Sequence, residues 1–207
     1  MQEKYIKFYQ NSHKIFLYWF LLTSFVLLAD EKESHKSYYT GEVDRVIKSL
    51  SANDIKDLTL GNGMGLAKAA ELNGYPGPKH VLEMQEELLL EKEQLTSIKL
   101  IFEEMKSQAK SQGQILISLE KELNDYFSDT TITNDTLKTT SKKIAEAKSN
   151  LRYIHLSAHI KTTEVLSKSQ IKKYNQLRGY ADNPCEKIPE GHNKEMWMLH
   201  NGCDQWK

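Results

Sequence analysis

The segment 95–126, LTSIKLIFEEMKSQAKSQGQILISLEKELNDY, decides the fold. Its positions 95, 98, 102, 105, 109, 112, 116, 119, 123 and 126 alternate in steps of three and four residues. They carry Leu, Ile, Phe, Met, Ala, Gln, Leu, Leu, Leu and Tyr, so that only Gln112 is polar. Apolar residues at this spacing form one stripe along an α-helix, as in the seam of a coiled coil. The pattern predicts a long helix that packs against a partner helix.

A second, weaker stripe of the same period follows at positions 137, 140, 144, 147, 151, 154, 158, 161 and 165. The polar segment 128–135 separates the two stripes and offers several residues that can cap a helix. Two matched stripes joined by a short turn predict an antiparallel helical hairpin, with arms on the order of 50 Å long. A lone hairpin is too thin to form a compact globule. We therefore expect it to pair with a second copy or with its flanking helices.

Shorter elements precede the hairpin. The sequence predicts helices near 43–50, at roughly 52–60 and at 66–72, with a break at the glycine-rich segment 61–65 and a turn at 73–78. The glycine-rich segment lacks the GxxxxGK[ST] and GxGxxG spacings of phosphate-binding loops, and no strand precedes it. We interpret it as a helix break.

The string Leu166-Ser-Lys-Ser-Gln170 predicts a sharp turn into a last helix. Ser167 can cap the helix while Gln170 bonds back to it, which is a capping box. Leu166 and Ile171 can form the accompanying hydrophobic staple. This helix is expected to end near Arg178-Gly179.

A similar string, Leu90-Glu-Lys-Glu-Gln94, stands at the start of the first long arm. Glu91 is a poor capping residue compared with Ser, Thr, Asp or Asn. The sequence therefore predicts a continuous helix or a gentle bend at this junction.

The N-terminal segment has a composition of its own. Basic residues precede the apolar run 15–29, and a polar stretch follows it, as in a secretory signal peptide cleaved after Ala29. Leu27 is large for the position two residues before that cut, so an uncleaved membrane anchor is the alternative. We assign 1–29 to this segment, 30–42 to a linker, 43–180 to the helical domain and 181–207 to a C-terminal tail. The expected location is the periplasm.

Composition limits the remaining choices. Of the 207 residues 39% are hydrophobic and 27% are charged, with 28 Lys+Arg against 28 Asp+Glu. A net charge of zero lacks the basic surface typical of nucleic-acid binding. After export, Cys185 and Cys203 would meet an oxidising compartment, where a disulfide is the default and two free thiols are the alternative.

Two features are candidates for metal binding. The first comprises His155 and His159, four residues apart on one helix face, together with His80 and its neighbours Glu83 and Met84. The second lies in the tail and comprises His192, Met196, Met198, His200 and Cys203. The first set suits Zn²⁺, Ni²⁺ or Cu²⁺, and the tail suits copper(I), or Zn²⁺ if the cysteine stays reduced. The alternatives are half-buried histidines bonded to the backbone or water, and a tail that docks on the bundle through its apolar residues.

The two five-residue strings resemble the Leu-[Thr/Ser]-x-x-Gln motif of the Spy/CpxP superfamily. Leu166-Ser-Lys-Ser-Gln170 is intact, and Leu90-Glu-Lys-Glu-Gln94 is degenerate. The segments 63–83 and 152–159 also look like a branch of this superfamily, so the resemblance covers roughly residues 40–180.

This resemblance implies a four-helix, all-α periplasmic protein without catalytic activity. Spy-like members are ATP-independent chaperones whose antiparallel dimer holds unfolded clients, and CpxP-like members restrain an envelope-stress kinase. Members related to the heavy-metal sensor CnrX, and the zinc-resistance-associated proteins, bind transition metals through histidines. The neutral charge departs from the basic client-binding surface of the chaperones. No nucleophile, base and orienting group stand together in the sequence, so we expect a binding protein that requires no cofactor.

Overall fold

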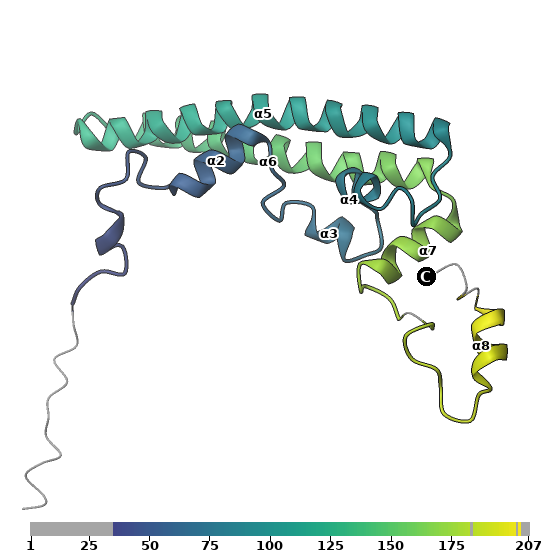
Figure 1. Ribbon diagram of the computed structural model, residues 1–207. Coiled ribbons are helices and arrows are strands. Elements are labelled where there is room, and N and C mark those ends of the chain that lie inside the picture. The colour runs from purple at the N-terminus through teal and green to yellow at the C-terminus, as the bar shows by residue number, and fades with distance from the viewer. Residues whose placement is uncertain (1–34, 183, 202, 204–207) are drawn as a thin grey trace, which may run out of the picture. The chain divides into compact units, whose positions relative to one another are not determined.

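The computed structural model describes residues 35–182, 184–201 and 203, and these residues form helices and turns without a strand (Figure 1). The helices are η1 (Thr40–Glu42), α2 (Ala52–Leu60), α3 (Lys68–Glu71), α4 (Pro78–Glu83), α5 (Lys92–Ser128), α6 (Asn134–Val165), α7 (Lys168–Leu177) and α8 (Lys194–His200). The described residues from Glu42 onward form one compact unit. The all-α prediction is confirmed. The predicted signal peptide or anchor at 1–29 lies outside the described residues.

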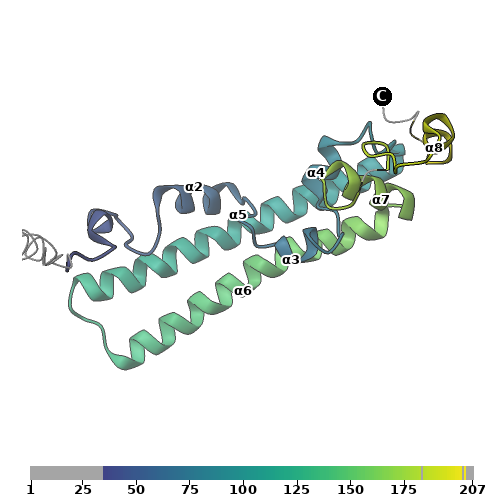
Figure 2. The same cartoon turned by 90° about the horizontal axis from the view of Figure 1, so that it is seen from below.

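Helices α5 and α6 form the predicted antiparallel hairpin. They run side by side along their length, with the turn between them at one end (Figure 2). Thr133 caps α6, its side chain accepting a hydrogen bond from the backbone N–H of Thr136. At 1.5 Å per residue, the 37 residues of α5 span about 55 Å.

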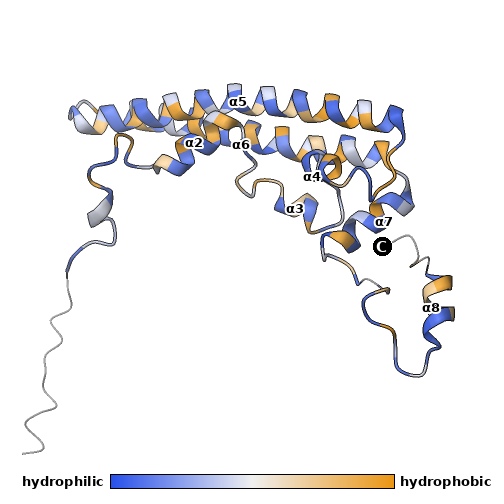
Figure 3. Ribbon diagram, in the orientation of Figure 1, coloured by the Kyte–Doolittle hydropathy of each residue, from blue (hydrophilic) through white to orange (hydrophobic). Residues whose placement is uncertain are grey.

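The two predicted stripes form the interface between these helices. On α5 it buries Ile98, Ala109 and Leu116, and on α6 Ile144, Ala147, Leu151 and Ala158. Apolar residues recur among polar ones along both helices (Figure 3). The stripe on α6 fails at two positions, since Leu137 and Lys161 are exposed.

Helix α2 lies against α5 at Gly113. A Cβ atom on Gly113 would lie 2.3 Å from the carbonyl oxygen of Leu58, so only glycine permits this approach. Leu58 thereby joins the hydrophobic core of the hairpin, with an exposed fraction of 2%. Ser51 caps α2 through a hydrogen bond from the backbone N–H of Asp54.

The predicted helix near 43–50 is wrong, because this segment is a series of turns and bends. Its polar groups bond to α5: the backbone N–H of Lys48 donates to Asn124, and the Ser49 hydroxyl donates to the buried carboxylate of Glu120. Ile47 and Leu50 still reach the core. The spacing of the apolar residues in this segment therefore reflects their burial and not a helix. The predicted helix at 66–72 is also shorter, since only Lys68–Glu71 is α-helical.

A second core cluster lies at the end of the hairpin opposite its turn. It joins Val81 of α4, Ile98 of α5, and Leu166 and Tyr174 at α7. Ser167 and Gln170 form the predicted capping box at the start of α7, and Ile171 packs against the same cluster as Leu166. Helix α7 ends at Leu177, close to the predicted position.

The prediction of a continuous helix through 90–95 is wrong. Helix α5 begins at Lys92, Glu91 is its N-cap in an extended conformation, and the Glu91 N–H donates to Oε1 of Gln94. Leu89, just before, has a φ of 49°. Tertiary contacts account for the sharp start, because Gln94 also bonds Gln170 and the carbonyl of Val165.

The tail carries a disulfide between Cys185 and Cys203, with a Cα–Cα distance of 5.5 Å. Within it, the Trp197 indole N–H donates to the carbonyl of Pro184. In the part of the chain that the structure describes, none of the helices has the length and apolar character that a membrane span needs.

Candidate functional site

A cavity of about 530 Å³ lies between the glycine-rich segment and the hairpin. Its walls come from α2, α3 and the start of α4 on one side and from α5 and α6 on the other. The residues that line it are Asp57, Gly61, Asn62, Gly63, Met64, Gly65, Ala67, Lys68, Glu71, Gly77, Pro78, Lys79, His80, Phe102, Met105, Lys106, His155, His159 and Arg178. This volume lies in the usual range of small-molecule sites.

The structure brings His80, His155 and His159 into the lining of this one cavity. His155 and His159 are buried, with exposed fractions of 4% and 7%, so they lie deeper than the half-buried alternative supposed. His80 is only partly buried. The three rings converge because α4, which follows the Pro-Gly-Pro turn, packs against α6.

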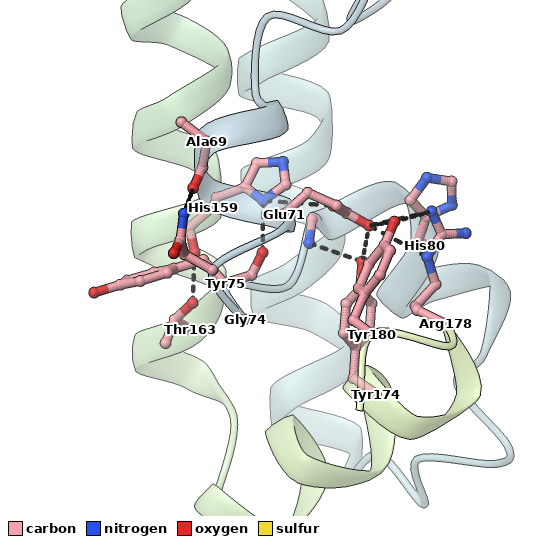
Figure 4. A network of polar contacts seen from close by, with 12 residues as sticks. Ala69, Glu71, Gly74, Tyr75, His80, His159, Thr163, Tyr174, Arg178 and Tyr180 are labelled. Carbon is pink, nitrogen blue, oxygen red and sulfur yellow. Dashed lines mark hydrogen bonds and ion pairs between the residues drawn. The ribbon is translucent and has the colours of Figure 1, made fainter. Parts of the chain in front are cut away.

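His159 holds the Pro-Gly-Pro turn (Figure 4). Its Nδ1 lies 2.8 Å from the carbonyl oxygen of Tyr75; since a carbonyl only accepts, Nδ1 carries the proton and donates. A Cβ atom on Gly77 would lie 2.8 Å from Cε1 of His159, so the backbone of the turn packs directly on the ring. The ring therefore contacts the turn in two ways, through the hydrogen bond of Nδ1 and through the packing of Gly77 on Cε1.

His155 is the unsatisfied member of the set. Its Nε2 is buried and has no hydrogen-bond partner among the described residues. Its Nδ1 lies 3.9 Å from the position that a Cβ of Gly63 would occupy, so it faces the glycine-rich segment. Burial, and then the nearby His159 and Lys106, lower the pKa of His155. The ring is consequently neutral at pH 7.

The predicted metal ligands His80, Glu83 and Met84 do not all face the cavity. Nδ1 of His80 lies 2.7 Å from the Glu83 carboxylate, and this hydrogen bond is the main cause that lowers the pKa of Glu83. Met84 packs against the core cluster of Val81 and does not line the cavity.

Glu71 is the centre of the polar network at the cavity wall (Figure 4). Its Oε1 accepts hydrogen bonds from the hydroxyl of Tyr174 at 2.8 Å, from Nε of Arg178 at 3.2 Å and from the hydroxyl of Tyr180 at 3.2 Å. Its Oε2 lies 3.8 Å from Nδ1 of His159. Helix α3 is thereby fixed to α6 and to the end of α7.

Tyr174 is the buried member of this network, with an exposed fraction of 0%. Its hydroxyl donates to Glu71 and accepts from the backbone N–H of Gly77 at 3.4 Å. Burial, followed by the hydrogen bond to Glu71, raises the pKa of Tyr174 far above its usual value.

The cavity wall is positive. Four basic side chains, Lys68, Lys79, Lys106 and Arg178, line it against the two carboxylates of Asp57 and Glu71. Lys106 donates to Oδ1 of Asn62, a neutral acceptor, and burial is the first cause that lowers its pKa. Like charges at this density disfavour a divalent cation and favour an anion.

The described residues hold no group of three or more His, Cys, Asp or Glu side chains in an arrangement that could hold a metal ion. In the tail, Cys203 is in the disulfide and so offers no thiolate. His192 packs edge-on against the ring of Trp197, with ring centroids 4.8 Å apart. Met196, Met198 and His200 lie on α8.

Sequence reasoning missed the residues that dominate the site, namely Glu71, Lys106, Tyr174 and Arg178. Glu71 and Lys106 look like ordinary charged residues on solvated helix faces. Tyr174 lies three residues after Ile171 on α7, and this apolar spacing was the one local signal for its burial.

Comparisons with family models, with curated proteins and with solved structures find no match to this chain.

Proposed function

We propose that this chain is an exported binding protein of the Spy/CpxP type, which acts as an ATP-independent chaperone or as a modulator of envelope stress and catalyses no reaction. The observation that carries the proposal is the pairing of the two Leu-x-x-x-Gln strings. Gln94 and Gln170 each accept a hydrogen bond from the N-cap N–H of their own helix, and their side-chain amides donate to one another. The same residues that carry the resemblance therefore meet in space.

Exposed apolar side chains on the hairpin support client binding. Tyr153 and Ile160 of α6 are 70% and 52% exposed and lie two turns apart on the same helix face, and Leu100 of α5 is 67% exposed. They stand among charged residues of both signs. Single apolar side chains spaced along a charged surface can bind an unfolded chain weakly at several points.

Aggregation of a model client tests this proposal. We expect the protein to suppress light scattering at near-stoichiometric amounts without ATP, and no suppression at excess would overturn the proposal. The double variant Tyr153→Ser with Ile160→Ser is expected to lose suppression while its stability changes by no more than about 0.5 kcal/mol per site. The matched control is Leu199→Ser in the tail, a residue that is 65% exposed.

The expected partners are unfolded envelope proteins, a stress- or metal-signalling partner and a second copy of the chain. Sedimentation equilibrium across a range of concentrations measures the last of these directly, and a homodimer is the expected result.

Metal sensing is the second candidate function, favoured by the one observation that His80, His155 and His159 share a cavity. Thermal unfolding of the metal-stripped protein with Zn²⁺, Ni²⁺ or Cu²⁺ tests it. A metal at about 100 times its dissociation constant adds about 2.7 kcal/mol and raises the Tm. A flat response to all three metals, or a rise retained in His155→Ala, would remove this candidate.

A further inference from the structure

The acidic groups of the cavity are already engaged within the protein. Glu71 accepts from Tyr174, Arg178 and Tyr180 through one oxygen. Asp57 accepts from the side-chain amide of Asn62 at 2.8 Å. Both carboxylates therefore bond to groups other than the cavity lysines.

The lysines of the cavity differ in this respect. Lys106 has the neutral oxygen of Asn62 as its hydrogen-bond partner, at 3.0 Å. The stem of Lys68 lies along the glycine-rich segment, with Cε 3.4 Å from the position that a Cβ of Gly65 would occupy. In the part of the chain that the structure describes, no carboxylate lies within ion-pair distance of either ammonium group, whereas Lys79 pairs with Glu83 at 3.7 Å. Lys106 and Lys68 therefore provide positive charge that the protein does not neutralise locally.

Beside these charges the cavity has an apolar wall. Phe102 and Met105 of α5 line it from one side, Met64 lines it from the glycine-rich segment, and Pro78 lines it from the first turn of α4. The His155 ring adds a buried nitrogen that no described protein group satisfies. Apolar side chains together with convergent polar groups are the usual lining of a small-molecule site, and this cavity has both.

We propose that this cavity binds a small organic anion, a carboxylate or a phosphate ester with an apolar body. Lys106 and Lys68 hold the anionic group, and Phe102, Met105 and Met64 contact the apolar part. An inorganic anion would leave the apolar wall without contacts, and a cation would meet the excess of positive side chains. This inference goes beyond the proposed function, since client binding is assigned to the exposed face of the hairpin.

Four probes that differ in head-group charge or in the apolar tail test the proposal on the full chain by calorimetric titration below micelle-forming concentrations. Octanoate and octyl phosphate carry an anionic head on an apolar tail. Octyltrimethylammonium has the same tail with the opposite charge, and inorganic phosphate has the head without the tail. We expect saturable binding of the two amphipathic anions and much weaker binding of the other two probes.

Variants place the binding in the cavity. We expect Lys106→Met to weaken octanoate binding roughly tenfold, since a lost hydrogen bond to a charged group is worth that much. Lys68→Met is the second variant; because Lys68 is exposed, we expect its replacement to leave the fold intact. Lys99→Met is the matched control, because Lys99 lies two turns before Lys106 on the same face of α5 but is exposed and does not line the cavity. This variant is expected to bind as the parent does.

Equal binding of octanoate and octyltrimethylammonium would overturn the proposal, as would unchanged affinity in both Lys106→Met and Lys68→Met. Saturable binding of Zn²⁺ alone, without binding of any organic anion, would also overturn it and favour the metal-sensing candidate. Client suppression is measured separately on the same variants. Variants that lose anion binding but still suppress aggregation would show that the cavity and client binding are separate functions. The two proposals can therefore fail independently of each other.

Discussion

The side-chain amides of Gln94 and Gln170, 76 positions apart in the chain, donate hydrogen bonds to each other at 3.0 and 2.9 Å. Each amide also donates to a backbone carbonyl of the opposite segment: Gln94 to Val165, and Gln170 to Leu88. Each amide oxygen accepts from the N-cap N–H of its own helix. The pair therefore caps two helices and joins them at once.

Replacing either glutamine by alanine is expected to lower the free energy of unfolding by about 1–3 kcal/mol, because several partly buried donors and acceptors are left unpaired at once. In a double-mutant cycle the two losses should be less than additive, since both variants break the same bonds. Urea unfolding measures this. Gln108→Ala, whose side chain bonds only Glu104 on an exposed face, is the control. Fully additive losses would contradict the coupling.

Gly113→Ala is expected to destabilise the protein by about 1–3 kcal/mol, because the new methyl group would overlap the Leu58 carbonyl and push α2 from α5. The sign is diagnostic, since alanine in place of glycine inside a helix usually stabilises by roughly 0.5–1 kcal/mol. Chemical denaturation gives the value, with Ser111→Ala on the exposed side of the same helix as the control. A stabilised Gly113→Ala would show that α2 does not lie against α5 at this point.

Glu71→Gln is expected to lower the free energy of unfolding by about 1–3 kcal/mol, since charge-assisted bonds from Tyr174, Arg178 and Tyr180 weaken together. Tyr174→Phe should lose less, because Glu71 keeps its other donors. Glu103→Gln on the exposed face of α5 is the matched control. Equal stability of Glu71→Gln and Glu103→Gln in thermal and urea unfolding would argue against the network.

The pH dependence of stability reports on His155. Its folded pKa is lowered below about 6.5, the value of an unfolded histidine, so on acidification the unfolded chain takes up the proton first. The stability that neutral His155 contributes is complete above that value and is lost as the pH falls through the folded pKa. We expect His155→Leu to flatten the loss of stability between about pH 7 and about pH 5.

Urea unfolding at a series of pH values measures this slope. His35→Gln, at an exposed position, is the control and is expected to keep the parent slope. A parent-like slope in His155→Leu would mean that other groups account for the acid sensitivity.

Much of the fold could be predicted from the sequence. The seam of α5, the turn before Asn134 and the capping box at Ser167 were each visible in short windows, because helix periodicity and capping depend on residues three or four positions apart. The failures have a common cause. The segment 43–50 and the start of α5 at Lys92 are set by hydrogen bonds to residues far along the chain.

For the site, the sequence indicated that His80, His155 and His159 could come together, and the structure places all three in one cavity. It did not indicate Glu71, whose partners Tyr174 and Arg178 lie 103 and 107 positions away. The positive charge of the cavity was equally hidden, since the whole chain has a net charge of zero.

The sequence by itself determined the long hairpin, its turn and the start of α7, because apolar period and capping are local properties of the chain. Only the tertiary structure decided that a carboxylate on α3, a tyrosine on α7 and two histidines on α6 meet at one wall, with Lys106 of α5 beside them. The physical reason is that burial and Coulomb interactions depend on distance in space, and packing brings together charges that the sequence keeps far apart.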